Sequence, residues 1–193
     1  MRKASLSRKT NETDISVSWN LDGTGKSSIS TGIPFIDHML DLFCRHGYFD
    51  LNISLKGDIE IDHHHSVEDL GIVMGQVFKE AVGDKKGINR YGNRLLPMDE
   101  SLAQVALDIS NRPHLSYKVP LQHPLETFDS SLIKEFFAAF VQQAGVTLHI
   151  TLLAGDNAHH CLEAVFKGVA KALDQALQLD GREADVPSTK GML

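Results

Sequence analysis

The chain has 193 residues, of which 42% are hydrophobic, and its formal net charge is −6. This length is sufficient for one sizeable core or two small halves, and a mildly acidic charge spread along the chain disfavours nucleic-acid and anionic-membrane partners. No apolar run approaches the length of a membrane span and no apolar signal region is present, so a cytoplasmic protein is expected. Cys44 and Cys161 stand in apolar helical stretches, and we expect buried free thiols.

The first half of the chain predicts strands followed by helices. Residues Thr13–Asn20 alternate in polarity, and Asp22-Gly23 predicts a hairpin turn into a second strand over Lys26–Thr31. A helical apolar pattern at 35–43, a strand at 50–55 and an amphipathic helix at roughly 65–82 follow.

The second half repeats this order after a basic segment, 83–94. Its predicted elements are strands at Ala103–Ser110 and Leu115–Val119, a helix at 132–140, a strand at 146–153 and a helix at roughly 159–178. Residues 35–43 and 132–140 match in their apolar positions. We therefore predict an α+β chain of two pseudo-symmetric β-β-α-β-(β)-α halves, approximately 1–90 and 91–193, fused into one catalytic domain with the sheets on a shared helical layer. The polar tail from Asp180 onward is expected to be extended.

A histidine pair opens the last helix of each half. His64 and Glu68, like His159 and Glu163, are four residues apart, which places imidazole and carboxylate on one helix face about 6 Å apart. The adjacent histidines, His65 and His160, point about 100° around the helix and are free to serve a second ion or a neighbouring subunit.

A single such pair is usually a surface feature, but its duplication in an internal repeat favours metal binding. Mixed imidazole and carboxylate ligands suit manganese, iron or zinc, and coordination above four favours manganese. Because only His64 and His65 align with the second pair, His63 is expected to lie outside the ligand set.

Several further motifs follow one another along nearly the whole chain. They are Asp-His-Met-Leu (37–40), His-His-x-x-Glu-Asp (64–69), Pro-Met-Asp-Glu (97–100), Asn-Arg-Pro (111–113), Thr-Leu-His (147–149), His-His-x-x-Glu (159–163) and Thr-Lys-Gly (189–191). Together they resemble the imidazoleglycerol-phosphate dehydratase family. The resemblance implies a ribosomal protein S5 domain 2-like fold, two Mn²⁺ ions per active site and no organic cofactor. It also implies active sites between the subunits of an octahedral homo-oligomer of about 24 chains.

The resemblance also implies roles for individual residues. The implied metal ligands are His38, His64, His65, Glu68, Glu135, His159, His160 and Glu163, although many family members have His at the position of Glu135. Glu12 matches a catalytic carboxylate that would otherwise be taken for an exposed strand-edge residue, and Glu68 and Glu163 are alternative bases. The implied substrate contacts are Glu12, Arg90, Asp99, Arg112, Lys167, Thr189 and Lys190.

The implied reaction is the dehydration of imidazole glycerol phosphate to imidazole acetol phosphate in histidine biosynthesis. Because no nucleotide-binding motif is present, we expect the substrate's own ring to accept electrons as an imidazolate stabilised by two cations. Two alternatives remain at this point: a dimetal phosphohydrolase, and a non-enzymatic assembly in which metals bridge subunits. The first would release inorganic phosphate, and the second has no need of the four cations Arg90, Arg112, Lys167 and Lys190.

Overall fold

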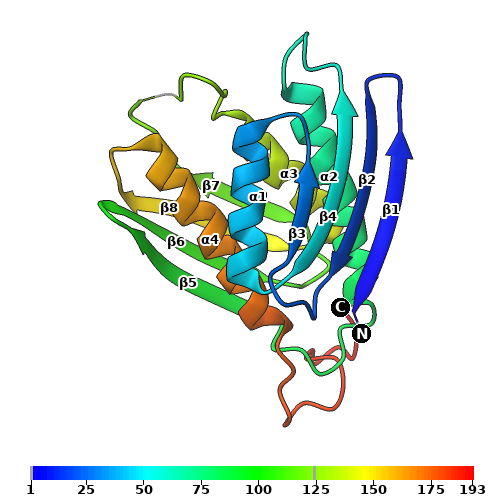
Figure 1. Ribbon diagram of the computed structural model, residues 1–193. Coiled ribbons are helices and arrows are strands. Elements are labelled where there is room, and N and C mark those ends of the chain that lie inside the picture. The colour runs from blue at the N-terminus through cyan, green and yellow to red at the C-terminus, as the bar shows by residue number, and fades with distance from the viewer. Residues whose placement is uncertain (1, 124) are drawn as a thin grey trace.

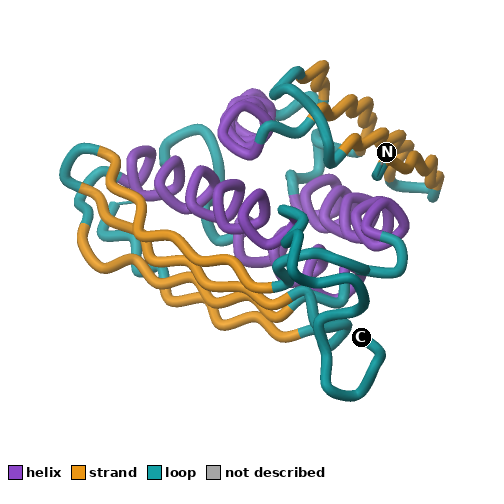
Figure 2. The backbone as a smooth tube through the Cα atoms, turned by 90° about the horizontal axis from the view of Figure 1, so that it is seen from below, coloured by secondary structure: helices purple, strands orange, loops and turns teal. Residues whose placement is uncertain are grey.

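The computed structural model describes residues 2–123 and 125–193, which form two four-stranded sheets with helices between them (Figures 1 and 2). The first half contains β1 (Lys3–Lys9), β2 (Thr13–Asn20), β3 (Ser27–Ser30), α1 (Pro34–Gly47), β4 (Asp50–Gly57) and α2 (His64–Val82). The second half contains β5 (Tyr91–Met98), β6 (Ser101–Asp108), β7 (His114–Lys118), α3 (Leu132–Ala144), β8 (Thr147–Ala154) and α4 (Ala158–Leu177).

The two sheets have the same strand order, β1-β2-β4-β3 and β5-β6-β8-β7. Helices α2 and α4 cover the inner faces of their own sheets, while α1 packs on α4 and α2 packs on α3 across the halves. The α+β class, the internal pseudo-symmetry and the shared helical layer predicted from the sequence are therefore confirmed.

The predicted hairpins are wrong in their strand pairing. β2 and β3 are not neighbours, because β4 lies between them, antiparallel to β2 and parallel to β3. The same holds for β6, β8 and β7 in the second sheet. The hairpin partners of β2 and β6 are instead the edge strands β1 and β5, which the sequence pattern does not predict. Each half is thus β-β-β-α-β-α.

The edge strands β1 and β5 lack a strong sequence signal because their side chains are only partly covered. Every residue of β1 is exposed or half-buried, whereas alternate residues of β2 are fully buried. β5 contains Pro97, a residue that sheets tolerate mainly at an edge. Polarity alternation therefore identifies the central strands better than β1 and β5.

A single hydrophobic cluster runs through both halves. Trp19 on β2 is fully buried, and its ring centroid lies 5.5 Å from that of Phe43 on α1, 5.6 Å from Phe78 on α2 and 6.4 Å from Phe140 on α3. Cys44 and Cys161 are buried free thiols, as expected. In the two described ranges, no helix has the length and apolar character needed to cross a membrane.

Candidate metal centre

Packing of α1 against α4 brings together three possible metal ligands from different halves of the chain. The Nε2 atoms of His38 and His159 lie 3.0 and 3.1 Å from Glu163 Oε1. The two imidazole rings are 5.4 Å apart between centroids. One ligand atom from each of the three residues falls within 4.8 Å of the others, a spacing that a single cation can bridge.

Glu163 is buried, with 7% of its surface exposed, and is surrounded by donors. Burial by itself would raise its pKa, but hydrogen bonds from Lys167 and His38, together with His159, hold the pKa of Glu163 at about 2. The Lys167 Nζ atom lies 2.6 Å from Oε2, the oxygen that the two histidines leave free. Glu163 is therefore an anion at neutral pH, and Lys167, expected as a substrate contact, compensates its charge here.

The second histidine of each pair contacts a different carboxylate. His65 Nδ1 lies 3.0 Å from Asp58 Oδ2, and His160 Nδ1 lies 2.8 Å from Glu100 Oε2. These hydrogen bonds raise the pKa of both histidines, and the bond from His160 lowers the pKa of Glu100 to about 2. As predicted, His65 and His160 therefore face away from the carboxylate that their neighbours contact.

The first-half pair is more open than the second. His64 Nε2 lies 3.5 Å from Glu68 Oε2, and the two side chains are 44% and 47% exposed. Among the described residues, no third ligand joins this pair as His38 joins the second pair. Glu135, expected as that ligand, instead lines a hollow with residues of β7 and of the segment before α3.

Glu12 and Asp99 occupy the turns of the two equivalent hairpins. Glu12 lies between β1 and β2, with Oε2 3.8 Å from His65 Nδ1, and Asp99 lies between β5 and β6, with Oδ2 4.0 Å from His160 Nδ1. Glu12 and Asp99 are therefore exposed, and each lies beside one of the histidines expected as metal ligands.

The remaining predicted substrate contacts gather at the other end of α4. Arg90, Arg112, Thr189 and Lys190 line a hollow of about 860 Å³ against the tail. The Arg90 guanidinium donates to both carboxylate oxygens of Asp108, at 2.7 and 3.0 Å, and to the Pro187 carbonyl at 2.8 Å. Arg90 thus secures the tail, while Arg112, 65% exposed, has the more accessible guanidinium.

Within one chain, the cations of this hollow lie far from the histidine cluster. The Arg90 amide donates to the carbonyl of Ala176, near the end of α4, whereas Glu163 lies near the start of the same helix. At about 1.5 Å per residue, Glu163 and Ala176 are roughly 20 Å apart along the helix. A phosphorylated ligand that contacted both groups within one chain would have to span this distance.

Comparisons with known proteins agree on one family. The family model described as imidazoleglycerol-phosphate dehydratase (IGPD) matches residues 31–173. The chain is 54% identical to an imidazoleglycerol-phosphate dehydratase of Bacillus licheniformis over 100% of both chains, and 56% identical to that of Citrifermentans bemidjiense over 100% of this chain and 99% of the relative.

Solved structures give the same result. An imidazoleglycerol-phosphate dehydratase of Staphylococcus aureus superposes with a TM-score of 0.84 at 42% identity, covering 92% of this chain and 99% of that chain. An IGPD of Pyrococcus furiosus superposes with a TM-score of 0.85 at 38% identity, covering 97% and 100%. The chain belongs to the imidazoleglycerol-phosphate dehydratase family. The resemblance predicted from the motifs is confirmed. The family consists of dehydratases of histidine biosynthesis, which are lyases.

The IGPD motifs do not predict every residue beside the histidines. Glu100 is the last residue of the Pro-Met-Asp-Glu motif and directly follows Asp99. Its place in this motif is a signal that could have identified it, but no role was predicted for it. Asp58 has no such signal, because it lies outside the motifs and meets His65 only through the fold. His63, expected outside the ligand set, has its ring stacked 5.9 Å from that of Phe128.

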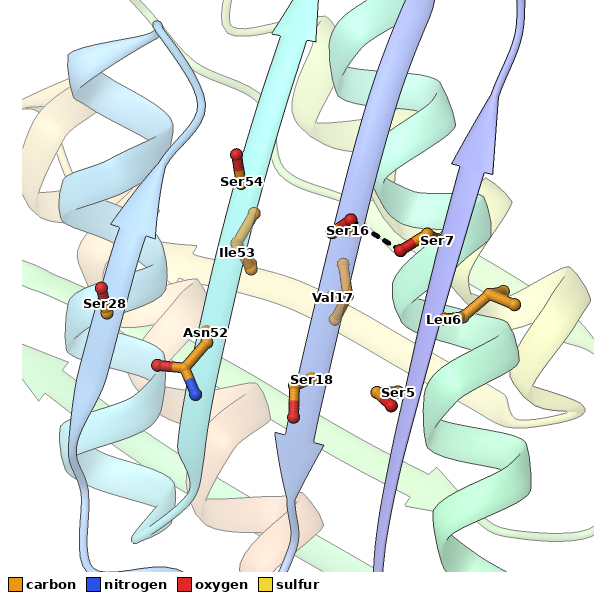
Figure 3. A pocket seen from close by; sticks show the side chains of 10 residues that line it. All are labelled: Ser5, Leu6, Ser7, Ser16, Val17, Ser18, Ser28, Asn52, Ile53 and Ser54. Carbon is orange, nitrogen blue, oxygen red and sulfur yellow. Dashed lines mark hydrogen bonds between the residues drawn. The ribbon is translucent and has the colours of Figure 1, made fainter.

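Another hollow in this IGPD chain, of about 360 Å³, lies on the outer face of the first sheet (Figure 3). Its lining consists of small hydroxyl, amide and aliphatic side chains, and the Ser7 and Ser16 hydroxyls are 2.6 Å apart. Among the described residues that line it, none is ionisable, so this hollow offers neither a general base nor a strong metal ligand. The histidine cluster remains the better candidate for chemistry.

Proposed function

We propose that the chain is a cytoplasmic enzyme that removes water from imidazole glycerol phosphate and forms imidazole acetol phosphate. The observation that carries this proposal is the convergence of His38, His159 and Glu163 from two halves of a chain in this family. Such mixed nitrogen and oxygen donors suit Mn²⁺, and we propose two ions per active site. Bound Mn²⁺ would supply Lewis acidity that lets the substrate's imidazole ring accept electron density.

The surroundings of the carboxylates favour different roles for them. Glu163, with a pKa of about 2 and three donors around it, is a weak base but a good ligand. Glu12 is exposed on a hairpin turn, and its ion pair within the described residues is the long one to His65 Nδ1, at 3.8 Å. We therefore assign proton transfer to Glu12, and metal binding to Glu68 and Glu163 beside their histidines.

The separation of roughly 20 Å along α4 favours an active site shared between chains. In this arrangement the histidine cluster of one chain faces Arg112, Thr189 and Lys190 of another, which bind the substrate phosphate. Glu135 and the open pair His64–Glu68 would then be completed by a neighbouring subunit. The proposed assembly is an octahedral homo-oligomer of about 24 chains, each a single catalytic domain of two fused halves.

Elemental analysis and product identification together test this function. Purified protein should contain two Mn²⁺ ions per chain, lose activity on chelation and regain it with Mn²⁺. Mass spectrometry should show the loss of one water from imidazole glycerol phosphate, with no release of inorganic phosphate. Phosphate release would instead indicate a phosphohydrolase, and bound metal without turnover would indicate a structural clip.

Replacing Glu12 with Gln tests the assigned proton transfer. The variant E12Q should keep its metal content and assembly but turn over about 10²–10⁴-fold more slowly, the usual contribution of a general acid–base group. The matched control is Glu60→Gln, an exposed carboxylate in the loop before α2, which should leave the rate unchanged. Equal rates for E12Q and the unaltered protein would remove Glu12 from the mechanism.

A further inference from the structure

The second histidine of each pair is held by a carboxylate that does not belong to the repeated motif. Asp58 follows β4 and contacts His65, whereas Glu100 lies in the β5–β6 turn and contacts His160, in both cases at Nδ1. The residue that follows β8 at nearly the position of Asp58 is Asp156, and its carboxylate meets Gln122 instead. The two halves thus reach the same histidine geometry with carboxylates from different segments.

Hydrogen bonds to neighbouring segments hold both residues in place. Glu100 Oε1 accepts hydrogen bonds from the Asn157 amide and the Ser101 hydroxyl, each at 3.0 Å, which leaves Oε2 for His160. The Asp58 amide donates to the Glu12 carbonyl at 3.2 Å. Asp58 Oδ1 is buried and has no hydrogen-bond partner within the described residues, so His65 is the side chain that this carboxylate holds.

A carboxylate accepts hydrogen bonds but cannot donate them, so it selects the ring nitrogen that carries the proton. With Nδ1 protonated, the lone pair of the neutral ring is on Nε2, the atom farther from the backbone. Carboxylates that bind a ligating imidazole in this way fix its orientation and increase its basicity. The first histidines differ, since Nε2 of His159 directly contacts the buried Glu163.

We propose that Asp58 and Glu100 are positioning residues that hold His65 and His160 in the Nδ1–H tautomer, with Nε2 directed to a divalent cation. The metal-binding part of this inference rests on the proposed function. The tautomer part does not, because both hydrogen bonds form in the chain by itself. The roles also explain why each pair contains two histidines: one contacts the helix's own carboxylate, and the other depends on a carboxylate from a loop.

Histidine tautomers and Mn²⁺ affinity provide the test. Solid-state NMR of metal-free protein with ¹⁵N-labelled histidine should show that Asp58→Ala and Glu100→Ala each reduce the Nδ1–H population. Titration with Mn²⁺ alone should show affinity weakened by about 10–100-fold in each variant. Glu100→Gln, whose amide oxygen can still accept the bond, should preserve the tautomer, and the matched control Asp156→Ala should change neither quantity.

Each outcome decides the inference. Unchanged tautomers in both alanine variants would overturn it, as would changed tautomers with undiminished Mn²⁺ affinity. If E100A fails to fold, D58A and E100Q carry the same comparison. If unaltered protein binds no Mn²⁺, the proposed function fails, and the cation-directing part fails with it, while the NMR comparison still decides whether the carboxylates set the tautomer.

Discussion

The carboxylate of Asp50 holds the loop between β2 and β3 in place. Asp50 at the start of β4 accepts hydrogen bonds from the backbone amides of Thr24 and Lys26 at 2.8 and 3.1 Å. The Leu51 amide also donates to the Lys26 carbonyl at 2.9 Å. These bonds tie the segment after Asp22-Gly23 to β4, so the chain passes to the far side of β4 instead of turning back along β2.

Removing this carboxylate should destabilise the protein in a pH-dependent way. The hydrogen bond from Thr24, together with that from Lys26, lowers the pKa of Asp50 below its ordinary value of 3.8. A lowered folded-state pKa means that the stabilisation is present above pH 3.8 and is lost as the pH falls through the folded value. Asp50→Ala should cost about 1–2 kcal/mol at neutral pH.

Urea unfolding at several pH values measures this difference. The gap between D50A and the unaltered protein should narrow as the pH falls below 3.8, because Asp50 of the unfolded chain is protonated there first and Asp50 of the folded protein only at lower pH. A gap that stays constant across this range would show that Asp50 acts through packing and not through its charge.

Close helix packing joins the halves at the level of elements. Gly71 and Gly75 on α2 face α3, and a Cβ atom added at these positions would lie 2.5 Å from the Phe136 carbonyl oxygen and 2.6 Å from the Phe140 carbonyl oxygen. Because these contacts are with backbone atoms, they cannot be relieved by a rotamer change. The two small residues, one helical turn apart, allow the helices to approach.

Substitution of Gly71 by Ala should therefore separate α2 from α3. Alanine favours a helix over glycine by about 1 kcal/mol, but the overpacking should cost more, so a net destabilisation of about 1–3 kcal/mol is expected. Thermal unfolding measures it. The control is Gly181→Ala, where no atom lies within 4 Å of the added Cβ, and the opposite ranking of the two variants would contradict the packing argument.

At the level of the whole molecule, the distance between the histidine cluster and the tail hollow has a consequence for mixed oligomers. Under the proposed function, Glu163→Gln disables the cluster of one chain and Arg112→Ala disables the cations of another. If sites are shared between chains, random mixing should leave roughly a quarter of the sites with both parts intact.

Co-expression of the two variants with different affinity tags tests this consequence. Doubly purified mixed oligomers should recover roughly a quarter of the unaltered activity, although each variant alone is nearly inactive. Activity that stays at the level of the single variants would place the complete site within one chain.

Local patterns in the sequence were sufficient to predict many of the helices and strands of this protein and part of its candidate site. Helices α2 and α4 begin within one residue of their predicted starts, and β2 has its predicted bounds, because helical and strand periodicities are properties of neighbouring residues. The duplicated histidine–glutamate spacing places His159 near Glu163 for the same reason. The family was predicted from short sequence motifs, which are also local patterns, and the family model confirms it.

Packing between distant segments decided the rest. Residue spacing does not specify that His38 joins Glu163, 125 positions away, instead of the histidine pair of its own half. It does not specify that β4 separates β2 from β3, or that Asp58 and Glu100 hold the second histidines. These contacts depend on how helices and sheets from the two halves meet, which is a property of the assembled core and not of any one segment.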